Sequence, residues 1–334
     1  MNIHLFGTLP NGEEVQEIHL KNGDMTARVI TWGAVVRDLR LPVSGRLRPV
    51  VLGFPRLSDY LRYSRNHGAN VGRYGGRIRE GRLVIDGRSY ALARNLDGRH
   101  HSHGGKVGLG RRNWRLVDAT STSVTLTIHS PDGDEGYPGA LDACCRYELG
   151  SQSLIVTITA HVSEPSPVNF LHHSYFNLDG AGRIHSHRLQ MLADQMLEAD
   201  TEGLPTGRIV PVAGGRFDFR LPQRINDPGL YDASYVLDGG LQINPRAAAR
   251  LWSGDGALQM DIRTTEPGLH FYSGYAAIAP VQYLDGRPCE SETGLCLEAT
   301  RFNDAVNQPH FGQILATPEK PYRQQTEFHF LATV

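Results

Sequence analysis

The chain has 334 residues, 40% of them hydrophobic, and its 34 basic and 35 acidic side chains leave a formal net charge of −1. Such a chain can bury a large core without disulfides or metals, and a near-zero net charge gives no reason to expect nucleic acid or a membrane surface as a partner. No stretch approaches the ~20 apolar residues of a membrane-spanning helix. The first residues also lack the basic region of a secretory signal, so a cytoplasmic protein is expected.

Alternation of apolar and polar residues predicts antiparallel strands along nearly the whole chain. Near the start, Asn22-Gly23 separates two strand-like runs, and Asp86-Gly87 does the same further on. Both dipeptides favour the positive φ of tight hairpins. The strand-like runs lie at residues 18–20, 25–30, 83–85, 88–92, 124–129 and 154–162.

Helix signals are weak. Residues 58–62 have the composition of a single helical turn, and residues 191–198 have helical propensity. The second segment lies between strand-like runs, so we expect context to override its propensity. No repeat, low-complexity segment or linker divides the chain. Residues 1–334 are therefore predicted to form one all-β domain, a large antiparallel sandwich.

The four cysteines do not form a zinc or redox pattern. Cys144 and Cys145 are adjacent and would point to opposite faces of a strand, which places them poorly for pairing with each other. Cys289 and Cys296 complete the set. We expect all four to be reduced thiols, mostly buried.

Two His-x-His pairs, at residues 101–103 and 185–187, have the spacing of ligands on one strand face. Neither has an evident third ligand, so a metal is not predicted. The acidic run at residues 132–136 lacks the spacing of a calcium loop. The sequence also contains no complete dinucleotide or phosphate-loop motif, and we expect an activity that needs no cofactor.

Two distant segments each place one proton-transfer group among aromatic and apolar neighbours. His173 lies in residues 168–178, Val-Asn-Phe-Leu-His-His-Ser-Tyr-Phe-Asn-Leu, and Glu298 lies in residues 297–307, Leu-Glu-Ala-Thr-Arg-Phe-Asn-Asp-Ala-Val-Asn. A carboxylate and an imidazole in such surroundings can act together as base and acid. Taken singly, each residue is more often structural, and it is their joint occurrence that suggests chemistry.

With the His103-Gly104-Gly105 turn and residues 72–78, Gly-Arg-Tyr-Gly-Gly-Arg-Ile, these segments resemble the aldose 1-epimerase (galactose mutarotase) family over roughly residues 3–332. The resemblance implies an antiparallel β-super-sandwich with a sugar site on a concave sheet face. It also implies an isomerase that interconverts the α and β anomers of an aldose. The expected partner is a small sugar or sugar-like molecule, and the expected assembly is a monomer or homodimer.

The resemblance also implies roles for individual residues. Glu298 looks like the base and His173 like the acid, while His103 is similar to the family's second active-site histidine. Arg77 and Asp232 look like the residues that bind sugar hydroxyls. Charge-assisted hydrogen bonds of this kind suit the orientation of a polyol.

Five positions depart from the family pattern around the expected sugar site: Gly76, His172 and Tyr275 stand in place of asparagine, Ala233 in place of histidine, and His270 in place of glutamine. His270 is still expected to bind substrate, and His172 is a candidate to replace a lost contact. One interpretation is drift at positions that do not touch substrate. A second is an unusual hemiacetal substrate, for instance in a specialised biosynthetic pathway. A third is a carbohydrate-binding protein without turnover.

Overall fold

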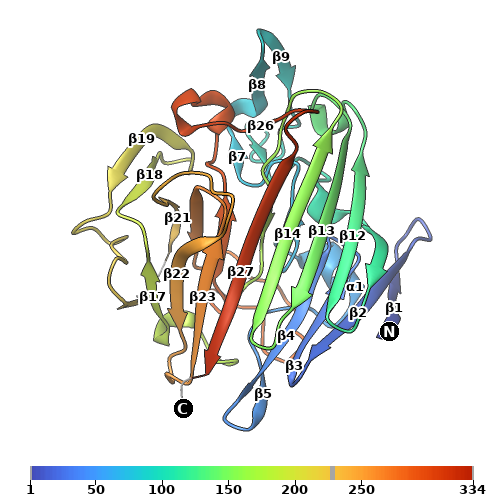
Figure 1. Cartoon of the computed structure of the whole chain (residues 1–334), viewed down its shortest axis with the longest axis vertical. Coiled ribbons are helices and arrows are strands. Elements are labelled where there is room, and N and C mark those ends of the chain that lie inside the picture. Colours follow the sequence, from blue (N-terminus) through green and yellow to red (C-terminus); the bar gives the residue numbers. More distant parts are fainter. Residues whose placement is uncertain (1, 226–229, 333–334) are drawn as a thin grey trace.

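The computed structural model describes residues 2–225 and 230–332, and in these residues the chain is almost entirely β-structure. A nine-stranded antiparallel sheet forms the broad layer that faces the viewer in Figure 1. Its order is β11 (Arg115–Ala119), β12 (Ser123–Ser130), β13 (Leu141–Leu149), β14 (Ser153–Val162), β27 (Tyr322–Ala332), β23 (Leu258–Thr264), β22 (Arg246–Trp252), β17 (Arg188–Met191) and β20 (Gln223–Arg224).

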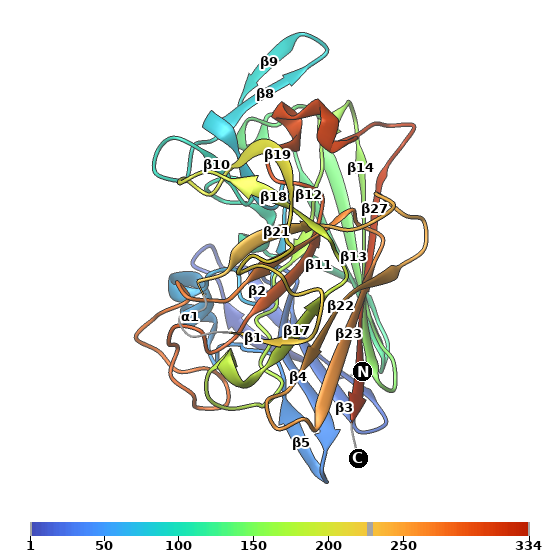
Figure 2. The same ribbon diagram turned by 90° about the vertical axis from the view of Figure 1, so that its left-hand side faces the viewer.

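Two five-stranded sheets lie behind this layer, as the edge-on view in Figure 2 shows. One contains β1 (Asn2–Thr8), β2 (Glu14–Asn22), β3 (Met25–Ile30), β4 (Val35–Val43) and β5 (Arg46–Pro49) in chain order. The other has the order β19 (Pro205–Pro211), β18 (Gln195–Ala199), β21 (Asp232–Val236), β24 (Gly268–Tyr272) and β25 (Cys296–Thr300).

Short two-stranded ladders and helices complete the second layer. The ladders are β7 (Arg77–Ile78) with β10 (His101–Ser102), β6 (Asn70–Val71) with β16 (Leu171–His172), β15 (Ser166–Pro167) with β26 (Leu315–Ala316), and β8 (Arg82–Ile85) with β9 (Arg88–Ala91). The helices are α1 (Leu57–Tyr63) and the 3₁₀ turns η1 (Arg79–Gly81), η2 (Leu109–Arg111), η3 (Asp134–Gly136), η4 (Ile184–Ser186), η5 (Ala305–Asn307) and η6 (Pro309–Phe311).

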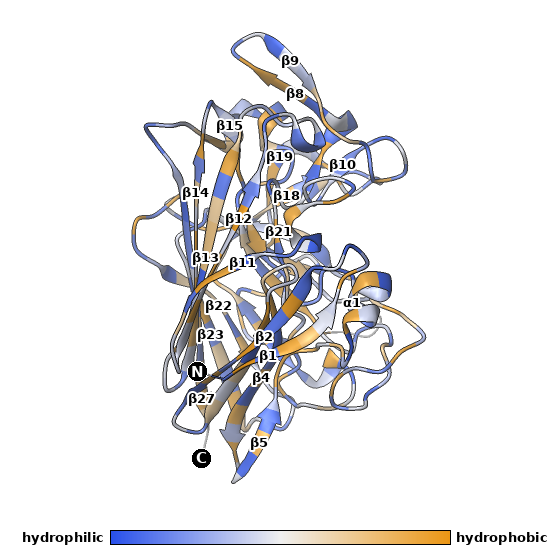
Figure 3. Cartoon of the chain, turned by 90° about the vertical axis from the view of Figure 1, so that its right-hand side faces the viewer, coloured by the Kyte–Doolittle hydropathy of each residue, from blue (hydrophilic) through white to orange (hydrophobic). Residues whose placement is uncertain are grey.

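The main core lies between the nine-stranded sheet and the two five-stranded sheets. On β14, Leu154, Val156 and Ile158 are buried in it, and the intervening residues are less buried. Leu39 enters the same core from β4, and Leu269 from β24. Hydrophilic and hydrophobic segments accordingly follow one another along the strands in Figure 3. The predicted all-β antiparallel sandwich is confirmed.

The local predictions hold with small differences. Asp86 and Gly87, both at positive φ, form the two-residue loop between β8 and β9. In the first hairpin Asn22 pairs with Met25, so the loop is Gly23-Asp24, one residue later than the Asn-Gly dipeptide suggested. Residues 191–198 contain the end of β17 and most of β18, which confirms that context overrides helical propensity there. The turn expected at residues 58–62 is part of the longer helix α1.

All four cysteines are free, with Cys144 half-buried and the other three buried. In the described part of the chain no helix is long and apolar enough to cross a membrane.

Candidate active site

A cleft of about 430 Å³ lies on the face of the β21–β24–β25 sheet that is turned away from the core. Strand alternation produces the two faces. On β24, Leu269 and Phe271 pack into the core, whereas His270 and Tyr272 line the cleft. The register places His270 opposite Glu298 on β25.

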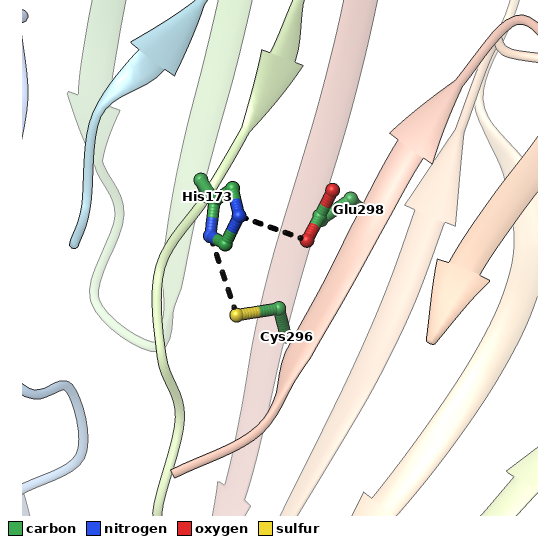
Figure 4. A group of neighbouring side chains, drawn as sticks. All are labelled: His173, Cys296 and Glu298. Atoms are coloured by element: carbon green, nitrogen blue, oxygen red, sulfur yellow. Dashed lines mark hydrogen bonds and ion pairs between the residues drawn. The ribbon is translucent and has the colours of Figure 1, made fainter. Parts of the chain in front are cut away.

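His173 and Glu298 meet at the buried floor of this cleft. His173 lies in the segment that follows β16, and Glu298 lies on β25. Nε2 of His173 is 3.4 Å from Oε1 of Glu298 (Figure 4). Both side chains are almost completely buried, at 7% and 3% exposure. The predicted acid and base are therefore neighbours, although 125 positions separate them in the sequence.

The imidazole of His173 is held by stacking and by its backbone. Tyr175 stacks on it with ring centroids 5.1 Å apart, and His67 stacks on the far side of Tyr175 at 4.2 Å. The His173 N–H donates to the carbonyl of Ala69, and its carbonyl accepts from Gly68. Stacking orients the ring and the two backbone hydrogen bonds fix its attachment point, as a proton-transfer group requires.

Cys296 contacts the other nitrogen of the same ring. Its Sγ lies 3.4 Å from Nδ1 of His173, so the ring sits between Cys296 and Glu298 (Figure 4). Burial, aided by the nearby Glu298 carboxylate, raises the pKa of the Cys296 thiol well above its ordinary value. A neutral thiol is a weak donor. A thiol that donates to Nδ1 places the proton of a neutral ring on Nε2, the nitrogen that faces Glu298.

His103 adds a neutral imidazole to the cleft wall. Its backbone is in the left-handed region (φ 52°), and its Nδ1 accepts a hydrogen bond from the N–H of Gly76 at 3.2 Å. Burial, with smaller contributions from His173 and Arg77, lowers the pKa of His103 well below its ordinary value. A neutral ring that accepts at Nδ1 carries its proton on Nε2, which makes Nε2 a hydrogen-bond donor.

Arg77, Asp232 and His270 form a connected polar wall. Asp232 accepts from Nη2 of Arg77 at 3.2 Å and from Nε2 of His270 at 2.8 Å. Nη1 of Arg77 also donates to the carbonyl of Gly203, and Nδ1 of His270 lies 2.8 Å from the hydroxyl of Ser234. These contacts fix the orientation of each group.

The charges of this wall follow from the same contacts. Burial alone would lower the pKa of His270, but the hydrogen bond and attraction to Asp232 outweigh it and raise that pKa. Burial alone would raise the pKa of Asp232, but the bonds from His270 and Arg77 hold it well below its usual range. The pair is biased toward imidazolium and carboxylate, a fixed set of charges that can orient hydroxyl groups.

The six residues predicted for the site all line this one cleft: Glu298, His173, His103, Arg77, Asp232 and His270. Two of the departures from the family pattern lie outside the cleft, and the expectation that His172 replaces a lost contact there is wrong. Ala233 lies on the opposite face of β21 from Asp232 and packs in the core, so it does not reshape the cleft. His172 also points away from the cleft, and its ring nitrogens contact Asn70 and Ser174. In both cases strand alternation places the neighbour of a cleft residue on the other face.

Sequence reasoning missed Cys296 and Asn303. Cys296 lies two residues before Glu298 on β25, so period-two alternation was an available signal. Asn303 lies beyond the end of β25, where no alternation applies, and only the folded chain brings it beside Arg77.

The two histidines of each His-x-His pair have different partners. His101 donates from Nδ1 to the carbonyl of Ala93 and accepts from Tyr137, while His103 faces the cleft. In the second pair, Nε2 of His185 lies 3.1 Å from the carboxylate of Glu292, whereas Nε2 of His187 accepts from the N–H of Leu178.

Across the described residues, one group of three metal-type donors lies together, consisting of His173, Cys296 and Glu298. Cys296 and Glu298 face different nitrogens of the His173 ring, an arrangement that suits hydrogen bonding better than a shared ion.

Comparison with known proteins identifies the family of the chain. A family model described as aldose 1-epimerase matches residues 16–329. The chain belongs to the aldose 1-epimerase family. Galactose mutarotase from Bos taurus is 36% identical over 337 residues, which cover 98% of this chain and 97% of the relative. Aldose 1-epimerase from Escherichia coli (strain K12) is 34% identical, with 97% of each chain covered.

Solved structures show the same fold. An aldose epimerase homologue from C. elegans superimposes with a TM-score of 0.88 at 27% identity, covering 95% of this chain and 99% of that one. Galactose 1-epimerase from Lactobacillus acidophilus NCFM superimposes with a TM-score of 0.84 at 26% identity, covering 100% of this chain and 99% of that one. As a family member over nearly its full length, the chain is an isomerase of the aldose 1-epimerase type.

Proposed function

We propose that the cleft interconverts the α and β anomers of an aldopyranose such as galactose, with Glu298 as base and His173 as acid. The observation that carries this proposal is the 3.4 Å separation of His173 Nε2 and Glu298 Oε1 in a buried site. The anomeric hydroxyl and the ring oxygen of a pyranose are bonded to the same carbon. An acid and a base that are close neighbours, as these two atoms are, can therefore reach both oxygens of one substrate molecule.

The reaction requires only proton transfer. Glu298 removes the proton of the anomeric hydroxyl, the bond between C1 and the ring oxygen breaks, and His173 donates the proton of Nε2 to the ring oxygen. The open aldehyde rotates about the C1–C2 bond and closes on its other face. Closure returns one proton to His173 and takes one from Glu298, so the enzyme ends in its starting state. Each positioned acid or base contributes on the order of 10²–10⁴ in rate.

The remaining polar groups bind and orient the sugar. His103, neutral and protonated on Nε2, can donate to an oxygen near the anomeric centre, where negative charge develops as the ring opens. Arg77, Asp232 and His270 are braced by one another and are suited to bind the other hydroxyls. Binding through these groups holds C1 over the acid and the base.

Substitution of the two proton-transfer groups tests the mechanism. Glu298→Gln and His173→Asn are each expected to lower kcat for D-galactose, followed by polarimetry, by about two to four decades. His129→Asn and Glu148→Gln are matched controls, since both side chains are exposed on the nine-stranded sheet. Near-wild-type turnover in either cleft variant would remove that residue from the mechanism.

A substrate screen tests the proposed aldose. D-Galactose, D-glucose, L-arabinose, D-xylose and L-fucose are compared by kcat/KM. Relatives that are galactose mutarotases support galactose as a substrate. Two of the five departures from the family pattern, His172 and Ala233, do not touch the cleft. We expect at least one hexose to reach about 10⁴ M⁻¹s⁻¹, within the usual range for enzymes. Turnover far below this value for every sugar would favour an unusual hemiacetal, and binding without turnover would favour a carbohydrate-binding protein.

A further inference from the structure

Gly76 leaves room in the cleft for a side chain from a distant segment. It lies directly before β7 with φ +87°, and a Cβ atom built on it would be 1.8 Å from Oδ1 of Asn303. Real Cβ atoms do not approach oxygen so closely. The volume that a side chain at position 76 would need is therefore filled by the amide of Asn303.

Asn303 is anchored at this point by its neighbours. Its Oδ1 accepts a hydrogen bond from the N–H of Arg77 at 3.1 Å. The next residue, Asp304, donates its own N–H to the carbonyl of Arg77 at 2.8 Å and accepts from the N–H of Arg79 at 2.9 Å. These three bonds join the segment after β25 to β7 and to the start of η1, so the Asn303 amide is held with its oxygen toward the backbone of Arg77.

The nitrogen of the same amide remains available. Nδ2 of Asn303 has no hydrogen-bond partner within residues 2–225 and 230–332, and Asn303 lines the cleft together with Arg77 and His103. A half-buried amide that is fixed by its oxygen presents its two N–H donors in a defined direction. Donors of this kind recognise hydroxyl oxygens.

We propose that Asn303 is a substrate-binding residue that donates from Nδ2 to a sugar hydroxyl next to the one bound by Arg77, and that Gly76 is required to make room for it. The proposal rests on the proposed function, since it assumes an aldose in the cleft. It makes the 76/303 pair a determinant of specificity. The competing explanation is that Asn303 only braces the backbone of Arg77.

The variant Asn303→Asp separates these two roles, because aspartate keeps the oxygen that accepts from Arg77 and loses both donors. We expect KM for D-galactose to rise about 3- to 10-fold with kcat within about twofold of the wild type. Asn307→Ala is the control, since its amide donates to Arg82 and Asp304 outside the cleft, and KM should not change. An unchanged KM in Asn303→Asp would overturn the proposal.

A series of monodeoxy sugars decides whether the effect passes through a hydroxyl. The 2-, 3-, 4- and 6-deoxy derivatives of D-galactose are assayed with the wild type and with Asn303→Asp. For the sugar that lacks the hydroxyl bound by Asn303, the two enzymes should have equal KM values, and for the others the difference should persist. An equal ratio for all four sugars would show a structural role and overturn the proposal. Absence of turnover in the wild type would instead contradict the proposed function.

The shared volume is tested by moving the amide from position 303 to position 76. Gly76→Asn alone should impair the enzyme, because the new side chain collides with Asn303. Combined with Asn303→Ala the same change should bring KM back to within about threefold of the wild type, since asparagine tolerates a positive φ better than most residues. Failure of the double variant to improve on Asn303→Ala would contradict the proposed exchange of space.

Discussion

Cys296 and Glu298 lie two residues apart on β25 and contact opposite nitrogens of the same imidazole. The thiol is the one side-chain partner described for Nδ1 of His173 in residues 2–225 and 230–332. We therefore expect it to set the tautomer, with the proton on Nε2, where the reaction needs it. Cys296 would then act on the chemistry without touching the sugar.

Removal of the thiol should weaken this preference. Cys296→Ala is expected to lower kcat by about 2- to 10-fold with little change in KM, since loss of one hydrogen-bond partner typically costs 0.5–1.5 kcal/mol. Cys296→Ser restores a donor and should recover most of the activity. The tautomer itself is measured by the ¹⁵N shifts of His173 in both variants. Identical ¹⁵N shifts in the wild type and Cys296→Ala would show that the thiol does not control the tautomer.

At the scale of the element, one face of β25 lines the cleft and its other face packs in the core. Glu298 and Thr300 line the cleft, whereas Leu297 and Ala299 pack in the main core. Leu297 is 1% exposed. A change on the core face should therefore affect the free energy of unfolding and leave the geometry of the cleft intact.

Leu297→Ala is expected to lower the free energy of unfolding by about 2–5 kcal/mol through lost burial and a residual cavity. The kcat and KM of the folded enzyme should stay near those of the wild type. Urea denaturation measures the first quantity and polarimetry the others. Leu331→Ala on β27 is the matched control, since Leu331 is 43% exposed and should shift stability by no more than about 0.5 kcal/mol. A large loss of kcat in Leu297→Ala would mean that the two faces are coupled.

At the scale of the whole molecule, one buried carboxyl links stability to pH. Glu266 is completely buried, and its side-chain oxygens have no hydrogen-bond partner among residues 2–225 and 230–332, although Oε2 lies 3.7 Å from Nε of Arg301. Burial raises its pKa from 4.5 to about 7, against the attraction of Arg301 and Arg246. The folded protein therefore holds this proton more tightly than the unfolded chain does.

The sign of the effect follows from linkage. A raised pKa contributes stability that is fully present below the unfolded value of 4.5 and is lost as pH rises through about 7. Between these limits the free energy of unfolding of the wild type should fall by roughly 3 kcal/mol relative to that of Glu266→Gln, which cannot ionise. Chemical denaturation of both proteins from about pH 4.5 to about pH 8 measures the difference. Parallel curves would show that Glu266 does not change its protonation in this range.

The sequence by itself determined the class of fold and singled out the two residues that we propose to transfer protons. Alternation of residues predicts strands because a strand between a core and solvent needs an apolar face, and this local rule holds clearly in β13, β14 and β27. His173 and Glu298 were recognisable because each lies in an extended motif. The same alternation places the neighbours of cleft residues on the core face, and the expectation for His172 was wrong because it did not apply this rule.

Only the tertiary structure decided which distant residues meet. Arg77, Asp232 and Asn303 come from separate segments, and their contacts depend on long-range strand pairing that no local pattern encodes. The same holds for Gly76 and Asn303. A side chain at position 76 would occupy the volume that the amide of Asn303 fills, and only the folded chain brings the two positions together. Period-two patterns fix which residues share a face, but the packing of whole sheets fixes which faces form a cleft.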